Sequence, residues 1–394
     1  MVEAKTSQHV LRTHEEPSIV RGGPFYKAQK AVRLILPNQW NLVRRVIFFV
    51  AIAWLPLFLA TAVFNTSALA SFLKDYRVHS RLLIAIPVLL FGEAFMESRF
   101  RAVLAHIRRA GLLEPRDLVS MDSVIATLVR LRDSFLPEIA ILALLAVHTI
   151  AAYKGLVGST PWLTSGAGAD LHLTAAGWYA VVVSSTLFQF LLGLGLWNWL
   201  LWTFFAFKLS RMNLNLVATH PDEHGGLGFL GLTAAAFAPV TFAATAVIGA
   251  TWRDDILHRG AHLINFKLPA IALVVIIAII ALGPLVFFVP RLGELRRNGI
   301  LEYGVLGQVH SDEFHEKWIR NRAGHEAEFL QAPEVSTLAD FGQAYERISQ
   351  LKPFPADIGT LYALGAAIAI PALPAILAEI PLAIVLKDLL SALR

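Results

Sequence analysis

The stretch IALVVIIAIIA, residues 271–281, consists of eleven apolar residues in succession. A strand of a membrane β-barrel would alternate apolar and polar residues over about ten positions, and this stretch does not alternate. It lies within a longer apolar run, 269–290, which is long enough for a helix to cross about 30 Å of hydrocarbon. The stretch therefore predicts a transmembrane helix.

The rest of the chain is as apolar in character as 269–290. It is 56% hydrophobic and 16% charged, with a mean hydropathy of +0.58, which is too apolar for a soluble domain. Seven runs could each span a bilayer, and they are 46–64, 82–97, 134–153, 176–207, 228–250, 269–290 and 357–386. The sequence predicts an all-α fold, a polytopic membrane bundle of about seven transmembrane helices with further amphipathic helices in the cytoplasm.

The basic residues predict the orientation. All 34 Lys and Arg residues lie outside the seven runs, and 25 of them lie in the four segments on one side, namely 1–45, 98–133, 208–227 and 291–356. An excess of Lys and Arg marks the cytoplasmic side, so we expect the N-terminus inside. The net charge of +5 then needs no nucleic-acid partner. The expected surroundings are a lipid bilayer, and the absence of cysteine suits a bacterial inner membrane.

The non-membrane segments suggest four parts. Residues 1–45 form a tail and a basic helix that either lies in the membrane interface or packs on the protein. A membrane domain, 46–290, contains the loop 98–133, in which two amphipathic helices break around Gly111–Pro115. The cytoplasmic segment 291–356 contains a helix expected from Thr337, as N-cap, to Leu351. The last part, 357–394, has three prolines and forms either one span or a hairpin turning at Pro371–Pro374.

The fourth run, 176–207, is longer than a bilayer requires, so its helix must tilt or project. Trp197, Trp199 and Trp202 near its inner end predict an aromatic belt, with a substrate-stacking site as the alternative.

Titratable residues inside the runs are candidate site residues, because hydrocarbon tolerates a charge only for a reason. Glu93 and Glu138 lie at similar shallow depth on the cytoplasmic side, where they could bind a cation, share a proton or pair with arginine. His148 and Glu379 lie near the outer ends of their runs. We expect a cytoplasm-facing vestibule bounded by Glu93, Glu138 and the loop that begins at His220.

That loop is the densest polar cluster, reading THPDEH at 219–224 and GGLGFL at 225–230. Gly225 and Gly226 could bring backbone N–H groups to an anion before a helix. Together with Asp222, His220 and His224 could hold a divalent metal, which is the cofactor that this pattern suggests. A Gly-rich turn that only caps a membrane helix is the structural alternative. The P-loop, HExxH and GxSxG motifs are absent from the sequence.

The HPD and GGLGFL motifs, the later LKPFPADI at 351–358 and the proline-broken tail resemble a widespread bacterial family of multi-pass membrane proteins with no assigned activity. The resemblance covers the second half of the chain and implies a site role for His220, Asp222 and the glycines, but no mechanism.

Two weaker clusters could also bind metal. Asp254, His258 and His262 recur every four residues and would share one helix face, as zinc ligands or as a solvated ion pair. His310, Asp312 and His315 form a similar group.

Three functions fit these features. A channel or transporter for a proton, cation or small solute is favoured because no catalytic motif is present. A membrane enzyme or binding protein with a metal or anion site at His220–Gly228 is the second, and a scaffold that recruits a partner through 291–356 is the third. Oligomerisation is compatible with all three.

Overall fold

The computed structural model describes residues 17–36, 40–156, 160–166, 172–320 and 333–380. Within them, six helical units are long and apolar enough to cross a membrane, and the pair α7 and α8, bent by 44°, makes a seventh if it counts as one span. The predicted all-α polytopic bundle is confirmed, and each of the seven runs falls on one of these units. The protein is a multi-pass membrane protein.

The first two spanning units are α3 (Leu42–Phe64) and the continuous unit of α5 (Tyr76–His79), η2 (Ser80–Ala85) and α6 (Ile86–Arg109). The bent pair is α7 (Pro115–Asp133) with α8 (Leu136–Leu156), and the next unit consists of α9 (Ala175–Tyr179), η4 (Ala180–Ser185) and α10 (Thr186–Ser210). The last three units are η5 (Gly228–Leu230) with α11 (Gly231–Ala235) and α12 (Ala238–Arg259), then η6 (Leu263–Phe266) with α13 (Lys267–Val286), and finally α16 (Ile358–Ile376). The other described elements are α2 (Gly23–Ala31), η1 (Thr66–Ala68), α4 (Leu69–Lys74), β1 (Thr164–Ser165), β2 (His172–Leu173), α14 (Val289–His315), η7 (Glu316–Arg320) and α15 (Pro333–Gln350).

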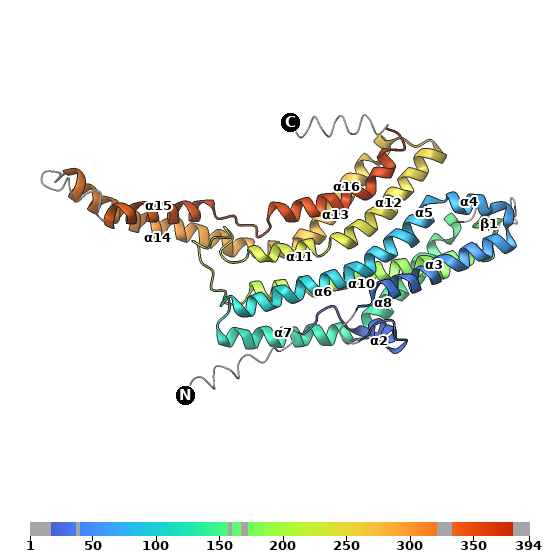
Figure 1. Ribbon diagram of the computed structural model, residues 1–394, viewed down its shortest axis with the longest axis horizontal. Coiled ribbons are helices and arrows are strands. Elements are labelled where there is room, and N and C mark those ends of the chain that lie inside the picture. Colours follow the sequence, from blue (N-terminus) through green and yellow to red (C-terminus); the bar gives the residue numbers. More distant parts are fainter. Residues whose placement is uncertain (1–16, 37–39, 157–159, 167–171, 321–332, 381–394) are drawn as a thin grey trace.

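The helices run along one long axis (Figure 1). The end with α7, α14 and α15 is here named the arm end, and α14 with α15 the arm. The opposite end, with the antiparallel pair β1 and β2, is the hairpin end.

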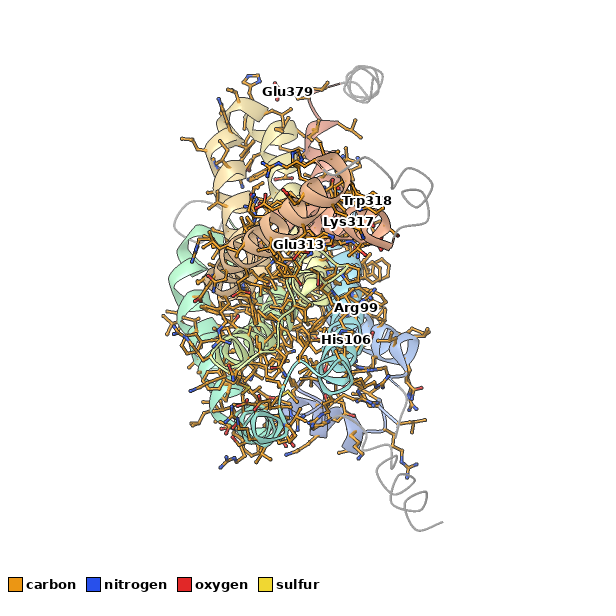
Figure 2. The ribbon with its side chains drawn as sticks, turned by 90° about the vertical axis from the view of Figure 1, so that its left-hand side faces the viewer. Arg99, His106, Glu313, Lys317, Trp318 and Glu379 are labelled. Carbon is orange, nitrogen blue, oxygen red and sulfur yellow. The ribbon has the colours of Figure 1, made fainter. Side chains whose placement is uncertain are left out.

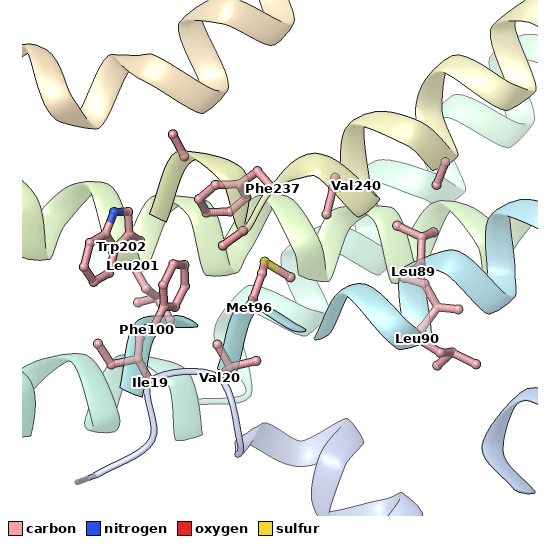
Figure 3. Packing of buried hydrophobic residues seen from close by; sticks show 14 of the residues in the cluster. Ile19, Val20, Leu89, Leu90, Met96, Phe100, Leu201, Trp202, Phe237 and Val240 are labelled. Atoms are coloured by element: carbon pink, nitrogen blue, oxygen red, sulfur yellow. The ribbon is translucent and has the colours of Figure 1, made fainter. Parts of the chain in front are cut away.

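The core between α6, α10 and α12 is aromatic. Phe100 on α6 stacks on Trp202 of α10 with ring centroids 4.5 Å apart, and Phe237 lies 5.8 Å from Phe100. Ile19 and Val20 of the N-terminal segment pack beneath this layer, beside Phe100 and Met96 (Figure 3). The predicted aromatic belt is therefore wrong for Trp202, which is 1% exposed and faces the protein core. The reason is that α10 packs on α6 and α7, so Trp202 is enclosed by Phe100 of α6 and is kept from the surface.

The last run crosses as one helix. α16 continues through Pro371 and Pro374 alongside α12, so the single span holds for the described residues and the hairpin alternative does not. A Cβ at Gly249 of α12 would stand 2.9 Å from the carbonyl oxygen of Pro371, and this close approach requires glycine. The helix ends near Glu379 at the hairpin end, and residues 381–394 lie outside the described part, as does the tail 1–16.

The predicted helices of the segments between the spans hold in outline. The break at 110–114 separates α6 from α7 as expected, although the first of the two helices is the continuation of the second span. The predicted start of the arm helix at Thr337 is wrong, because α15 already begins at Pro333. Proline is favoured at the first helical position, where its missing N–H is not needed. α15 packs on α14 where Phe341 meets Gly307.

Candidate functional site

A small cavity of about 40 Å³ lies among α6, α8, α10 and the N-terminal segment. Both Glu93 and Glu138 line it, with Trp197 and Asn198 of α10 and with Arg132 at the end of α7. We call it the carboxylate cavity. The two glutamates were expected to face a common space from the same depth, and the structure brings them to one cavity.

Glu93 is bound to an arginine from the first turn of α3. The Nη2 atom of Arg45 lies 2.5 Å from Oε2 of Glu93, and its Nε donates to Oε1 of Gln29 at 2.8 Å. Arg45 is fully buried and also covers the ring of Trp40 at 5.3 Å. A buried arginine requires such a partner, because an uncompensated charge away from water is costly.

Glu138 is satisfied differently, by a helix N-terminus. Its two carboxylate oxygens accept the backbone N–H of Phe25 at 2.9 and 3.1 Å. Asp133, at the end of α7, accepts the N–H of Gly23 at 2.9 Å. The same carboxylate pairs with Arg132 at 2.9 Å. Two carboxylates thus hold the start of α2, where the helix dipole favours negative charge.

The wall opposite the carboxylates carries polar groups without protein partners. The indole N–H of Trp197 is buried and has no hydrogen-bond acceptor among the described residues. Asn198 is 8% exposed, and its amide lines the same space. Because buried polar groups are normally hydrogen-bonded, these donors and acceptors favour bound water or an ion in the cavity.

The N-terminal segment, residues 17–36, closes the cavity on its remaining side. Val20, Gly22, Gly23 and Phe25 are part of the lining. Ser18 donates to the buried Glu97 at 2.5 Å, and Arg132 donates to the carbonyl oxygen of Ser18 at 2.5 Å. α2 therefore packs on the bundle, while Lys27 and Lys30 on its outer side remain exposed to solvent or headgroups.

The loop at His220 uses its carboxylate internally. Asp222 accepts the backbone N–H groups of His224, Gly226 and Gly228 at 2.9, 3.1 and 2.9 Å, and His220 lies 2.7 Å from it. Burial opposes ionisation, but these four contacts together hold the pKa of Asp222 below its ordinary value. The N–H of Gly226 points to the protein's own carboxylate and not to an external anion. Gly225 and Gly226 are needed for their φ angles of 63° and 93°.

His224 in the same loop is 5% exposed, and its Nδ1 contacts the carbonyl oxygen of Asp222 at 2.5 Å. Glu223 instead pairs with Lys352 at 2.6 Å and so joins the loop to the segment before α16. The geometry favours the structural alternative, a Gly-rich turn that caps and anchors, over a metal or anion site.

The expected single vestibule is divided into two places. His106 near the end of α6 contacts Phe229 with ring centroids 4.3 Å apart, so the His220 loop lies at that level. His106 follows Glu93 by thirteen residues of one helix, a separation of about 20 Å. The loop therefore does not line the carboxylate cavity, because the two places lie at levels of α6 that are separated by this length of helix.

The predicted metal-binding group at the hairpin end, Asp254, His258 and His262, is also divided. Asp254 lies 3.1 Å from Nδ1 of His258 and 3.4 Å from Arg77, as an ion-pair network. α12 ends at Arg259, so His262 leaves the shared face and lies 3.2 Å from Glu379. Across the residues that the structure describes, no group of three His, Asp or Glu side chains is arranged to hold a metal, the His310 group included. His148 is exposed on α8.

Two arginines matter that the sequence assigned to loops. Arg45 lies inside α3. Asn41, one helical turn before it, is the N-cap residue and could have marked the start of this helix in the sequence. Arg81 lies inside the unit Tyr76–Arg109, directly before the run 82–97, where a hydropathy boundary hid it.

Comparison of the chain with protein-family models, with curated proteins and with solved structures found no match.

Proposed function

We propose that the protein is a membrane transporter or channel for a proton, a cation or a small solute, with the carboxylate cavity as its ion-binding position. This proposal rests mainly on the observation that Glu93 and Glu138, from separate spans, line one small cavity together with the unpartnered indole N–H of Trp197 on α10. Ionisable groups placed inside a bundle mark ion pathways in membrane proteins.

The volume of the cavity restricts which class of cargo it can hold. One water molecule needs about 10–15 Å³ of such space, so about 40 Å³ holds about three or four waters. A proton carried by water, or one monatomic cation, fits this volume, whereas an organic solute requires a different conformation. We therefore favour a proton or a monatomic cation among the three cargo classes.

We also propose the orientation and the membrane. By sequence, 25 of the 34 Lys and Arg residues belong to the segments 1–45, 98–133, 208–227 and 291–356, which favours a cytoplasmic arm end and N-terminus. The bacterial inner membrane is the proposed location. The cavity then lies close to the cytoplasmic face.

The test is flux through the full-length chain in liposomes. Proton entry is followed with an enclosed pH dye under a potassium diffusion potential, and Na⁺ and K⁺ entry with ion-selective dyes. We expect flux of at least one ion, reduced by roughly tenfold or more in Glu138→Gln. The matched control is Glu302→Gln, which changes an exposed glutamate on the arm. Absence of flux for every ion, or equal flux in all variants, would contradict the proposal.

Glu93 requires a paired design, because Glu93→Gln alone leaves Arg45 buried without its carboxylate. The double variant Arg45→Met/Glu93→Gln removes both charges together. A folded double variant with lost flux assigns the loss to the site and not to misfolding.

A second candidate function, a scaffold, is favoured by one observation on the arm. Leu301, Val305 and Val309 form a stripe along α14 outside the membrane and are 69%, 70% and 52% exposed. Figure 2 shows the arm pointing toward the viewer, with Glu313, Lys317 and Trp318 on it. Since the chain has no cysteine, Val305→Cys gives one cross-linking position, and Gln343→Cys on α15 is the control. A defined cross-linked partner at 305 alone would support a scaffold.

A further inference from the structure

Arg81 lies within the bundle with few partners. It belongs to η2, inside the spanning unit Tyr76–Arg109, and its side chain is partly accessible. Its guanidinium donates one hydrogen bond, to Oγ of Ser185 at 3.0 Å, and lies 6.0 Å from the ring centre of Phe188. A guanidinium has five N–H donors, so most of its capacity is unused.

Hydrogen bonds between helices fix the depth of Arg81. Ser184, next to its partner Ser185, donates to the carbonyl oxygen of Ala53 at 2.6 Å. Ala53 is the twelfth of the 23 residues of α3, at the middle of that span. Arg81 also precedes Glu93 by twelve residues, or about 18 Å of helix, on the side away from the arm end. Arg81 therefore lies near mid-depth and well apart from the carboxylate cavity.

Among the described residues no carboxylate contacts the guanidinium of Arg81 directly, in contrast to that of Arg45, and Asp75 acts on its charge only from a longer distance. No Asp or Glu of the described residues lies within 4.0 Å of the Arg81 guanidinium. Asp75, the acidic residue that precedes it by six positions, is engaged by the indole N–H of Trp162 at 3.0 Å and by the backbone N–H of Arg77 at 3.1 Å. Charged groups in a bilayer are normally paired or bound to a ligand, so the missing partner points to an anion.

The backbone supplies a second observation. η2 and η4 are both π-helical turns of six residues, and Arg81 and Ser185 belong to one each. π-helical turns are rare and concentrate at functional sites, because the extra residue redirects side chains. Two such turns are joined through the hydrogen bond from Arg81 to Ser185, and this arrangement indicates a built site and not a packing accident.

We propose that Arg81 and Ser185 bind a small oxyanion, either a carboxylate or an inorganic oxyanion, near the middle of the bundle. The planar guanidinium matches two oxygens of such a group, and the Ser185 hydroxyl supplies a third donor. The site differs from the carboxylate cavity in position and in charge. It is a binding site that exists whether or not the cavity conducts ions.

The experiment measures anion binding by the full-length protein in an uncharged detergent at constant ionic strength in chloride. Acetate, phosphate and sulfate are titrated separately, and the thermal unfolding midpoint and binding heat are recorded. We expect a saturable rise of the midpoint with at least one oxyanion. Arg81→Lys should weaken that binding by roughly tenfold or more, since lysine is a point charge. Arg81→Gln should abolish it, and Arg297→Gln, which changes an exposed arginine of α14, should leave it unchanged.

A further readout separates ligand binding from a structural role. Because Arg81 lacks a carboxylate, Arg81→Gln should unfold at the same or a higher temperature than the wild type when no oxyanion is added. A lower midpoint would show that the guanidinium stabilises the fold through Ser185, and this would overturn the proposal. The same holds if no oxyanion binds the wild type, or if Arg81→Gln binds as well as the wild type. Since none of these measurements uses flux, their failure is independent of the proposed transport.

Discussion

Replacing Asp222 tests the physical account of the loop at His220 most directly. In the wild type the carboxylate accepts three backbone N–H groups at 2.9 to 3.1 Å. Hydrogen bonds to a charged group contribute about 1.5–3 kcal/mol each, and water replaces part of each bond in a half-buried loop. Asp222→Ala should therefore destabilise the loop locally by about 3 kcal/mol, and Asp222→Asn, which keeps one acceptor oxygen, by about 1–2 kcal/mol.

Hydrogen exchange of the backbone amides between 220 and 230 measures this change. A loss of about 3 kcal/mol corresponds to exchange faster by more than about 100-fold through local opening. Asp340→Asn, at an exposed position of the arm, is the matched control. If exchange in Asp222→Ala stays within about threefold of the wild type, the carboxylate does not organise the loop.

The pH dependence has a defined sign. The hydrogen bonds lower the pKa of Asp222 below 3.8, so the folded state favours the ionised form. The stabilisation is fully present above the unfolded pKa and is lost as the pH falls through the lower, folded pKa. The exchange difference between the wild type and Asp222→Asn should hold at neutral pH and shrink only below 3.8. A difference that disappears at higher pH would contradict the assignment.

Three further results are expected in detergent unfolding measurements. Arg45→Met alone should destabilise by about 3–5 kcal/mol, and Arg45→Met/Glu93→Gln should recover most of it; additive losses would refute the pairing. Gly249→Ala should lower stability by about 1–3 kcal/mol because its Cβ would meet a carbonyl oxygen of α16 at 2.9 Å, whereas Gly365→Ala, with open space around it, should not. Glu379→Gln should loosen η6 at neutral pH, since hydrogen bonds from Leu263 and His262 lower the pKa of Glu379, and an unchanged exchange rate at the Leu263 amide would contradict this.

The spans could be predicted because hydropathy is a local property, readable from runs such as 269–290. Counting residues from the ends of the runs predicted a common level for Glu93 and Glu138, and both line one cavity. Their partners could not, because Arg45 and Phe25 reach them from a segment distant in sequence. The sequence of the loop at His220 also does not reveal whether the carboxylate of Asp222 binds the loop's own backbone or faces an external ligand.

The second limit of prediction concerns residues that lie next to the end of an apolar run. Arg81 stands one residue before an apolar run, so a window that maximises hydropathy excludes it, although its helix begins at Tyr76. The π-helical turns that hold it insert a single residue into a helix, and no side-chain period marks them. Trp202 shows the same limit for aromatic residues, because interface and core both favour tryptophan.

The two glutamates of the carboxylate cavity depend on the same short segment. Glu138 accepts the backbone N–H of Phe25, and the Arg45 that neutralises Glu93 also donates to Gln29 of the same helix, α2. The segment that closes the cavity is therefore held by the groups that line it. Opening the cavity toward the arm end by moving α2 would leave Glu138 without its hydrogen-bond donor and free to take a proton or a cation. Under the proposed function, access to the cavity and ion binding at Glu138 would then be coupled through this one contact.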